Sequence, residues 1–292
     1  MNIVQELIKN KLINPPGFIE SNLSYTTVIG SQAYGMSNDD SDQDLYSFAV
    51  TQKEELFPHL YGVLHGFGKK KEIFETYSKH GIIHKDKEYD VSIHGIVKYF
   101  NLLLDNNPSQ LETLFTPFNC VLYTNEVGKL VRDNRHIFLS KKCYHRYIGY
   151  AYGQLSLMSR KNVTGKRLAL YEKYGYDTKA ASHVVRLCYF GEQILQENDL
   201  ETTRHSEHLK AIRKGEMTEV ELRQWFTSRE QSLKKLYDDS KIQYSPDEEA
   251  IKRLLLQCLE CHYGSLEKCI TLQDKYEVAV KKIRDVLAKA GL

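Results

Sequence analysis

The sequence predicts an α+β fold, in which an N-terminal domain with a mixed β-sheet and flanking helices precedes a mainly α-helical C-terminal region. Two observations predict it. In the first part of the chain, short runs of β-branched and aromatic residues alternate with turns rich in Gly, Asp and Asn. From residue 143 onward, apolar residues recur almost throughout at helical spacing. We therefore expect two domains, residues 1–120 and residues 121–292.

Three segments of the first domain have the character of strands. Ser24–Ile29 is rich in β-branched and aromatic residues and stops at a glycine, as a buried strand does. Leu45–Val50 follows a polar turn and is predicted as a second strand. Tyr89–Ile93 is predicted as a third, in which Asp90 lies on the face opposite to Val91 because successive side chains alternate.

Helices are predicted from the spacing of apolar residues and from residues that favour helix ends. Residues 96–104 carry apolar side chains at helical spacing, and Asn106-Asn107-Pro108 ends this helix. Ser245 is predicted to cap a later helix, since Pro246 suits its first turn and Glu248 completes a capping box. The longer predicted helices are Cys143–Arg160, Lys179–Gln196, Thr218–Tyr237, Pro246–His262 and Leu272–Ala290.

The composition is that of an ordinary globular protein, with 41% apolar and 27% charged residues among 292. A net charge of +2 gives no global field toward nucleic acid or an anionic membrane, so any site for a polyanion must be local. No apolar stretch is long enough to span a bilayer, and no signal peptide is recognised. We expect a cytoplasmic protein without a membrane partner, whose six cysteines stay reduced.

Residues 28–45 carry the pattern that points to chemistry. A predicted strand ends in Gly30 and Ser31, a turn of helix follows, and an Asp-x-Asp pair, Asp42 and Asp44, opens the next strand. On a strand both carboxylates project from one face, where they repel each other unless a cation lies between them. Such oxygen ligands favour a hard ion such as Mg²⁺, which adds substrate phosphates to its shell. Gly30 allows close approach to a phosphate, and the N–H of Ser31 can bind it.

A plainer interpretation is that Asn38–Asp42 forms a solvated turn between strands, which is what an isolated Asp-x-Asp pair more often is. The preceding strand, the Gly-Ser pair and the helix start at this spacing favour the metal site instead. Two ions bound there would stabilise the attacking and leaving oxygens of an in-line phosphoryl displacement.

This pattern resembles the signature of the DNA-polymerase-β-like nucleotidyltransferase superfamily. More narrowly, the sequence is similar to the predicted nucleotidyltransferase family that includes RNA-ligase-associated members, over most of residues 25–220. It departs from the family at Leu45-Tyr46-Ser47, where members often carry a small residue. The motifs that carry the likeness are Gly30-Ser-x-x-Tyr34-Gly35, Ser41-Asp42-x-Asp44, Asn107-Pro108-Ser-Gln-Leu-Glu112, Lys179-Ala-Ala-Ser-His183-Val-Val-Arg186 and Ile212-Arg-Lys-Gly-Glu216.

The resemblance implies a third carboxylate on a neighbouring strand. Asp90 is the best candidate, Glu88 on the same face is its rival, and the alternative for Asp90 is a charge at a strand edge. In the family's arrangement Asp42, Asp44 and Asp90 would hold two Mg²⁺ or Mn²⁺ ions, and the Gly-Ser pair would position the β- and γ-phosphates of a nucleoside triphosphate (NTP). Asp90 would also act as the general base for the acceptor hydroxyl.

Lys179, His183 and Arg186 share one face of a predicted helix, where three donors in a row suit a triphosphate or a base edge. A charged solvated face is the usual explanation of such a stripe, and the resemblance favours contact with the nucleotide. His80 and His84 flank Gly81, which favours a loop, and no metal site is inferred there.

The sequence therefore predicts an enzyme, a metal-dependent nucleotidyltransferase that transfers a nucleoside monophosphate from an NTP such as ATP to a hydroxyl and releases pyrophosphate. An RNA 3′ end is the favoured acceptor, by analogy with RNA-ligase-associated members. Two alternatives stay open: a regulatory protein that binds nucleotide without turnover, and a transferase that nucleotidylates protein. The sequence leaves the oligomeric state open.

Overall fold

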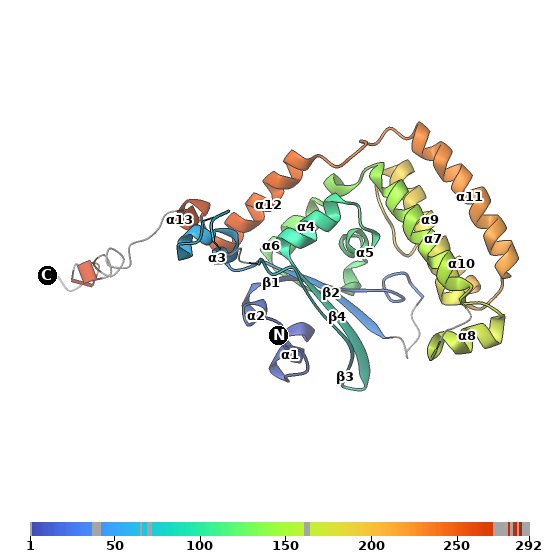
Figure 1. The fold of residues 1–292 in the computed structure, drawn as a ribbon, viewed down its shortest axis with the longest axis horizontal. Helices are drawn as coiled ribbons and strands as arrows, with labels where there is room; N and C mark the ends of the chain where they lie inside the picture. Colours follow the sequence, from blue (N-terminus) through green and yellow to red (C-terminus); the bar gives the residue numbers. More distant parts are fainter. Residues whose placement is uncertain are drawn as a thin grey trace.

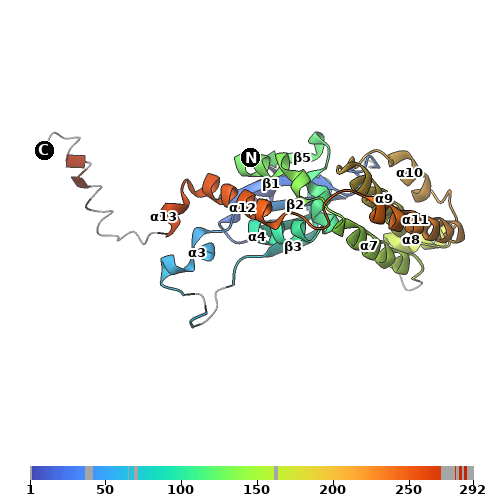
Figure 2. The same ribbon diagram turned by 90° about the horizontal axis from the view of Figure 1, so that it is seen from above.

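The computed structural model describes residues 2–36, 42–64, 66–68, 72–160, 164–270, 280, 283–284 and 286–287. It confirms the α+β prediction, because a five-stranded mixed sheet with flanking helices precedes a mainly helical region (Figure 1). Seen from above, the helices between residues 142 and 239 gather at one end of the molecule, beside the sheet (Figure 2). The predicted helix Leu272–Ala290 lies largely outside the described residues.

The sheet has the strand order β3-β4-β2-β1-β5. The central strand β2 runs parallel to β4 and antiparallel to β1, and the two remaining pairs are antiparallel. Residues of β2 are therefore framed by partners on both sides. The strands are β1 (Leu23–Ile29), β2 (Gln43–Ala49), β3 (Thr76–His84), β4 (Lys87–Gly95) and β5 (Val121–Thr124).

Helices cover the sheet and build the second part of the molecule. Among the described residues, no helix combines the length and the apolar character that a membrane crossing needs. The α-helices are α1 (Ile3–Lys9), α2 (Ile19–Asn22), α3 (Lys53–Leu56), α4 (Ile96–Leu104), α5 (Pro108–Leu111), α6 (Glu126–Asp133), α7 (Lys142–Met158), α8 (Lys166–Tyr174), α9 (Thr178–Glu197), α10 (Ser206–Arg213), α11 (Glu219–Asp239), α12 (Glu248–Tyr263) and α13 (Leu266–Ile270). The 3₁₀-helices are η1 (Pro58–Tyr61), η2 (Glu112–Leu114), η3 (Phe118–Cys120) and η4 (Arg135–Phe138).

Aromatic side chains join the sheet to the helices that cover it. Tyr25 of β1 stacks on Phe48 of β2 with 5.8 Å between ring centroids, and Phe48 stacks on Tyr99 of α4 at 4.6 Å. Each such pair adds about 0.5–1.5 kcal/mol beyond the burial of its area. The Tyr25 hydroxyl donates to the carbonyl of Thr113 and accepts from the buried Arg132 of α6. These contacts fix α4 and α6 relative to the sheet.

The helical region is organised around α9, most of whose residues are buried. α7 packs along α9, and α10 and α11 flank it (Figure 1). The side chain of Asp177 caps α9 by accepting hydrogen bonds from the N–H groups of Lys179 and Ala180 at 2.9 and 3.0 Å. The start of α9 is thereby held in one conformation.

Most predicted elements are confirmed with ends within two residues of those observed. The predicted cap at Ser245 is wrong: Asp247 caps α12 by accepting from the N–H of Ala250 at 3.0 Å, because an aspartate serves this position equally well. β3 was not predicted. β5 extends the sheet beyond residue 120, and the division into two domains stays a prediction.

Gly128 should be intolerant of a side chain, because a Cβ atom there would overlap the carbonyl oxygen of Ser24 and the hydroxyl of Thr124. We expect Gly128→Ala to lower the free energy of unfolding by about 1–3 kcal/mol, measured by urea denaturation. Gly149→Ala on α7 is the control, since nothing lies within 4 Å of its Cβ position. This exposed helical change should stabilise the protein by roughly 0.5–1 kcal/mol. Equal effects of the two changes would contradict the packing of α6 on β1.

Candidate active site

The pairing of β2 with β4 brings two of the predicted metal ligands together. Asp44 lies directly opposite Asp90 in the parallel register, so both side chains project from the same face of the sheet. Burial raises the pKa of Asp44, and the charge of Asp90 raises it further. Both effects disfavour the ionised carboxylate, so a cation bound here would relieve them.

Asp90 is held by the edge strand β3. Its Oδ1 accepts a hydrogen bond from the N–H of Gly81 at 2.8 Å, and its Oδ2 lies 3.0 Å from Nδ1 of His80. The register of β3 shifts at this point, and a φ of +65° at Gly81 marks a bulge that turns both groups toward Asp90. In the strand register Asp90 is the residue opposite Asp44, whereas Glu88 lies two residues nearer to the turn between β3 and β4.

His80 is a neighbour of the aspartates that sequence reasoning missed. In the sequence Gly81 favours a loop, whereas a glycine inside a strand also marks a bulge. The side chain of His80 is 70% exposed, and its charge lowers the pKa of Asp44 in opposition to burial. His80 is therefore accessible to a ligand that binds at this face of the sheet.

Asp42 stands directly before β2, and its charge also raises the pKa of Asp44. The polar turn predicted at Ser37–Ser41 lies outside the described residues. Within the described part of the chain, no three His, Cys, Asp or Glu side chains form a complete metal-binding group. Asp44 and Asp90 supply two carboxylates on one face, which fits Mg²⁺ sites that take their other ligands from phosphates and water.

Gly30 lies against Asp44 at the end of β1. Its φ is +76°, and a Cβ atom there would overlap Oδ2 of Asp44. Only glycine combines this conformation with so close an approach. The segment that follows forms turns, in which the N–H of Tyr34 donates to Gly30 and the N–H of Met36 donates to Ser31. The Gly-Ser backbone is thus adjacent to the carboxylates, as the motif predicts.

The three predicted donors of α9 have different surroundings. Lys179 is exposed and near enough to Asp44 for its charge to lower that pKa. Burial holds the pKa of His183 well below its usual range, and the adjacent Arg186 and Lys179 depress it further, so His183 is neutral at physiological pH. Arg186 is buried and forms an ion pair with Glu112. Only Lys179 of the three is an exposed cation beside the aspartates.

Two further cations, Arg167 and Arg213, lie near the start of α9. Arg167 of α8 forms an ion pair with the buried Asp177, and the charges of Arg167 and Arg213 both depress the pKa of His183. Burial lowers the pKa of Arg213, and the Asp177 carboxylate opposes that shift. Because these residues come from α8 and α10, their approach to α9 could not be read from spacing along the chain. Together with Lys179 they form a cationic side to the site.

Tyr46 follows Asp44 by two residues on β2 and marks the departure from the family pattern. Burial raises its pKa to about 12, and the charges of Asp44 and Glu112 add to the shift. The phenol is therefore neutral at physiological pH and lies near the carboxylate of Asp44 as an uncharged group.

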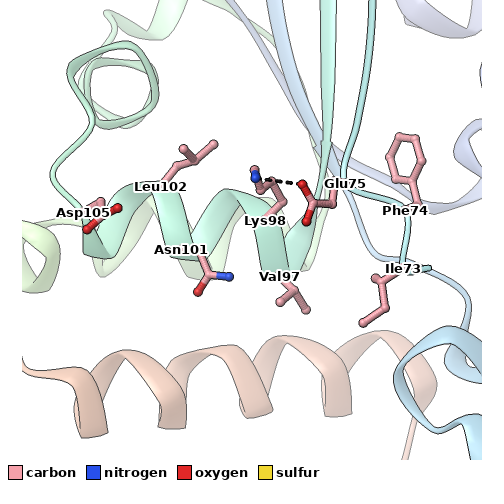
Figure 3. A pocket seen from close by; sticks show the side chains of 8 residues that line it. All are labelled: Ile73, Phe74, Glu75, Val97, Lys98, Asn101, Leu102 and Asp105. Atoms are coloured by element: carbon pink, nitrogen blue, oxygen red, sulfur yellow. Dashed lines mark hydrogen bonds and ion pairs between the residues drawn. The ribbon is translucent and has the colours of Figure 1, made fainter. Parts of the chain in front are cut away.

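A cavity of about 330 Å³ lies elsewhere, between α4 and the start of β3 (Figure 3). Lys98 and Glu75 form an ion pair of 2.8 Å across its wall. It is near the ends of β2 and β4 that are opposite to Asp44 and Asp90, and it contains no predicted site residue. Its lining residues are Ile73, Phe74, Glu75, Val97, Lys98, Asn101, Leu102 and Asp105.

The raised pKa of Asp44 has a consequence for stability in the absence of metal. An acid whose pKa is higher in the folded state loses stability as pH rises from its ordinary value, 3.8, through the raised value. We therefore expect Asp44→Asn to raise the melting temperature in EDTA at neutral pH. Asp105→Asn is the control and should lower the melting temperature. A hydrogen bond from Lys142 lowers the pKa of Asp105, so its ionised carboxylate stabilises the folded state at neutral pH. A lower melting temperature for Asp44→Asn would contradict this account.

Comparison with known proteins identifies the family. The model of RlaP, the RNA repair pathway DNA polymerase beta family, matches residues 5–256. Among solved structures, the chain is similar to a nucleotidyltransferase-like protein from Exiguobacterium sibiricum 255-15, with 12% identity, covering 88% of this chain and 73% of that chain. The TM-score of this match is 0.30. No curated protein matches the chain.

The family match spans Gly30, the three aspartates and Lys179, and it confirms the resemblance inferred from the motifs. The family match indicates a DNA polymerase β-like nucleotidyltransferase. The chain belongs to the RNA repair pathway DNA polymerase beta family.

Proposed function

We propose that this protein transfers a nucleoside monophosphate from an NTP to the 3′-hydroxyl of an RNA and releases pyrophosphate. The observation that carries the proposal is the pair Asp44 and Asp90, opposite each other on β2 and β4 with Gly30 packed against Asp44. The family description supports RNA as the acceptor. We also propose a cytoplasmic location, where the six free cysteines would stay reduced.

Asp42, Asp44 and Asp90 are the residues that would hold two divalent ions, Mg²⁺ or Mn²⁺. Bound ions would stabilise charge on the attacking and leaving oxygens of an in-line displacement. The side chain of Asp90 is 33% exposed, which supports its role as the general base that accepts the proton of the RNA hydroxyl. The deeper position of Asp44 suits a ligand of both ions.

The triphosphate would lie between the Gly30-Ser31 backbone and the start of α9. The absence of a Cβ at Gly30 and the N–H of Ser31 suit the β- and γ-phosphates. Lys179, with Arg167 and Arg213 behind it, supplies positive charge from the helical side. His183 is neutral, so we assign it a hydrogen bond to the nucleotide instead of an ionic contact.

The reaction is tested by incubating the protein with Mg²⁺, radiolabelled NTP and RNA ending in either a 3′-hydroxyl or a 3′-phosphate. We expect label on the 3′-hydroxyl RNA alone, with one pyrophosphate per nucleotide added. Label on protein would make the enzyme a protein nucleotidyltransferase. Tight NTP binding without pyrophosphate or label would make it a regulatory nucleotide-binding protein.

Removing a metal-binding carboxylate should abolish transfer while the fold is kept. We expect Asp42→Ala and Asp44→Ala to lower kcat about 1000-fold or more, since loss of the ions removes several kcal/mol of transition-state stabilisation. Asp90→Asn should be nearly as damaging. Asp86→Asn, at the exposed turn of the same hairpin, is its control and should keep full activity. If Asp90→Asn kept full activity and Glu88→Gln lost activity, Glu88 would be the third carboxylate in place of Asp90.

Lys179 should contribute to NTP binding through its charge. We expect Lys179→Met to raise the KM for NTP roughly tenfold, because a charge-assisted contact to phosphate is lost. Lys210→Met is a matched control, since Lys210 pairs with Glu207 on the exposed face of α10. The contact would be excluded by steady-state kinetics that give the same KM for both variants.

A further inference from the structure

Three side chains that are far apart in the sequence meet between the sheet and the helical region. The hydroxyl of Tyr34 donates to Oε2 of Glu112 at 2.6 Å, and the guanidinium of Arg186 forms an ion pair with the same oxygen. The guanidinium also lies 4.2 Å from the centroid of the Tyr34 ring. We call Tyr34, Glu112 and Arg186 the buried bridge.

The buried bridge is almost inaccessible to solvent, since the side chains of Glu112 and Arg186 are 1% and 10% exposed. Burial raises the pKa of Glu112, and the nearby Arg186 charge opposes that shift. A buried ion pair is no more stabilising than apolar side chains of the same volume, and often less. Stability alone therefore does not account for the buried bridge. Its other effect is to connect the segments that carry its three residues.

The buried bridge joins both sides of the proposed triphosphate site. Tyr34 belongs to the loop of residues 31–36, which begins at the Gly-Ser pair. Arg186 lies on α9, about two turns after Lys179. Glu112, at the start of η2, contacts both and so fixes the loop relative to the helix.

A second contact anchors the same loop to the helical region. The buried hydroxyl of Thr202 donates to the carbonyl of Ala33 at 2.7 Å. Gly35 lies against Ser206 at the start of α10, where an added Cβ would come within 3.1 Å of the serine Cβ. The loop is thus held from α9 and α10, while Asp44 and Asp90 are held by the sheet.

We propose that Glu112 and Arg186 are positioning residues, which keep the Gly30-Ser31 loop at a fixed distance from Lys179 so that a triphosphate is bound between them. This inference rests on the proposed function. A site whose groups are ordered on folding binds more tightly than one that must be ordered by the ligand. Loss of the buried bridge should weaken NTP binding and leave the aspartates in place, so that KM rises and kcat is kept.

The first test is Tyr34→Phe, which removes one hydroxyl and keeps the ring. We expect the KM and the Kd for Mg²⁺–NTP to rise roughly tenfold, with kcat close to that of the wild type. Tyr99→Phe is the matched control, because its buried hydroxyl bonds Thr113 at 2.6 Å without touching the loop. Both variants lose one buried hydrogen bond, so a purely structural effect would lower the melting temperature of both and leave their KM values alike.

The second test replaces the charged pair with apolar side chains, Glu112→Leu together with Arg186→Met, which leaves no unpaired charge in the core. We expect this double variant to fold and to raise KM as Tyr34→Phe does. Adding Tyr34→Phe to it should have little further effect, because the three residues act as one unit. Thr202→Val should raise KM further in either background, since that contact is separate.

The outcomes separate the inference from the proposed function. Equal KM values for Tyr34→Phe and Tyr99→Phe would overturn the inference and leave transfer activity standing. A far larger loss in the double variant than in Tyr34→Phe, with kcat reduced, would also overturn it and make Arg186 a direct nucleotide ligand. A wild-type protein that neither binds nor transfers NTP would overturn both.

Discussion

Like charges on Asp44 and Asp90 repel each other across the β2–β4 pair, and burial removes much of the water that would screen them. The sheet has to hold the two carboxylates in place against this repulsion. It does so with a central strand bonded on both sides, an aromatic stack beneath β1 and β2, and an N–H of Gly81 directed at Asp90. The two carboxylates are thus held side by side at a cost in stability that the surrounding core offsets.

The helical region supplies the complementary charge in a similarly fixed form. Asp177 caps α9 and pairs with Arg167, so one buried carboxylate orders both the helix start and a cation beside it. Glu112 has the corresponding role for Arg186 and the loop after β1. Two buried carboxylates, Asp177 and Glu112, therefore fix the positions of basic and backbone groups near the aspartates. Under the proposed function, the two sides of the nucleotide site would be in place before the nucleotide binds.

Local patterns were enough to predict β1 and the ends of α9, whereas the carboxylate of Asp90 on a strand beside Asp44 was implied by the family resemblance. β3 escaped prediction because it is an exposed edge strand in which polar residues surround Gly81, so the alternation that marks a half-buried strand is weak. Helical periodicity correctly put Lys179 and Arg186 on one face. It could not show that Arg186 meets Glu112, 74 residues away, while Lys179 remains exposed. Contacts between distant segments depend on tertiary packing, and the spacing of residues within one segment cannot predict them.

The position of α12 bears on how the chain acquires this structure. Although it follows the whole helical region, α12 returns to pack on α4 and α6, and Tyr263 donates a hydrogen bond to the carbonyl of Thr51 (Figure 1). The layer of helices over the sheet is therefore complete only after α12 has been made, later than the whole helical region. Such distant contacts slow folding, and they leave apolar surface of α4 and α6 open to chaperones while the chain is still growing.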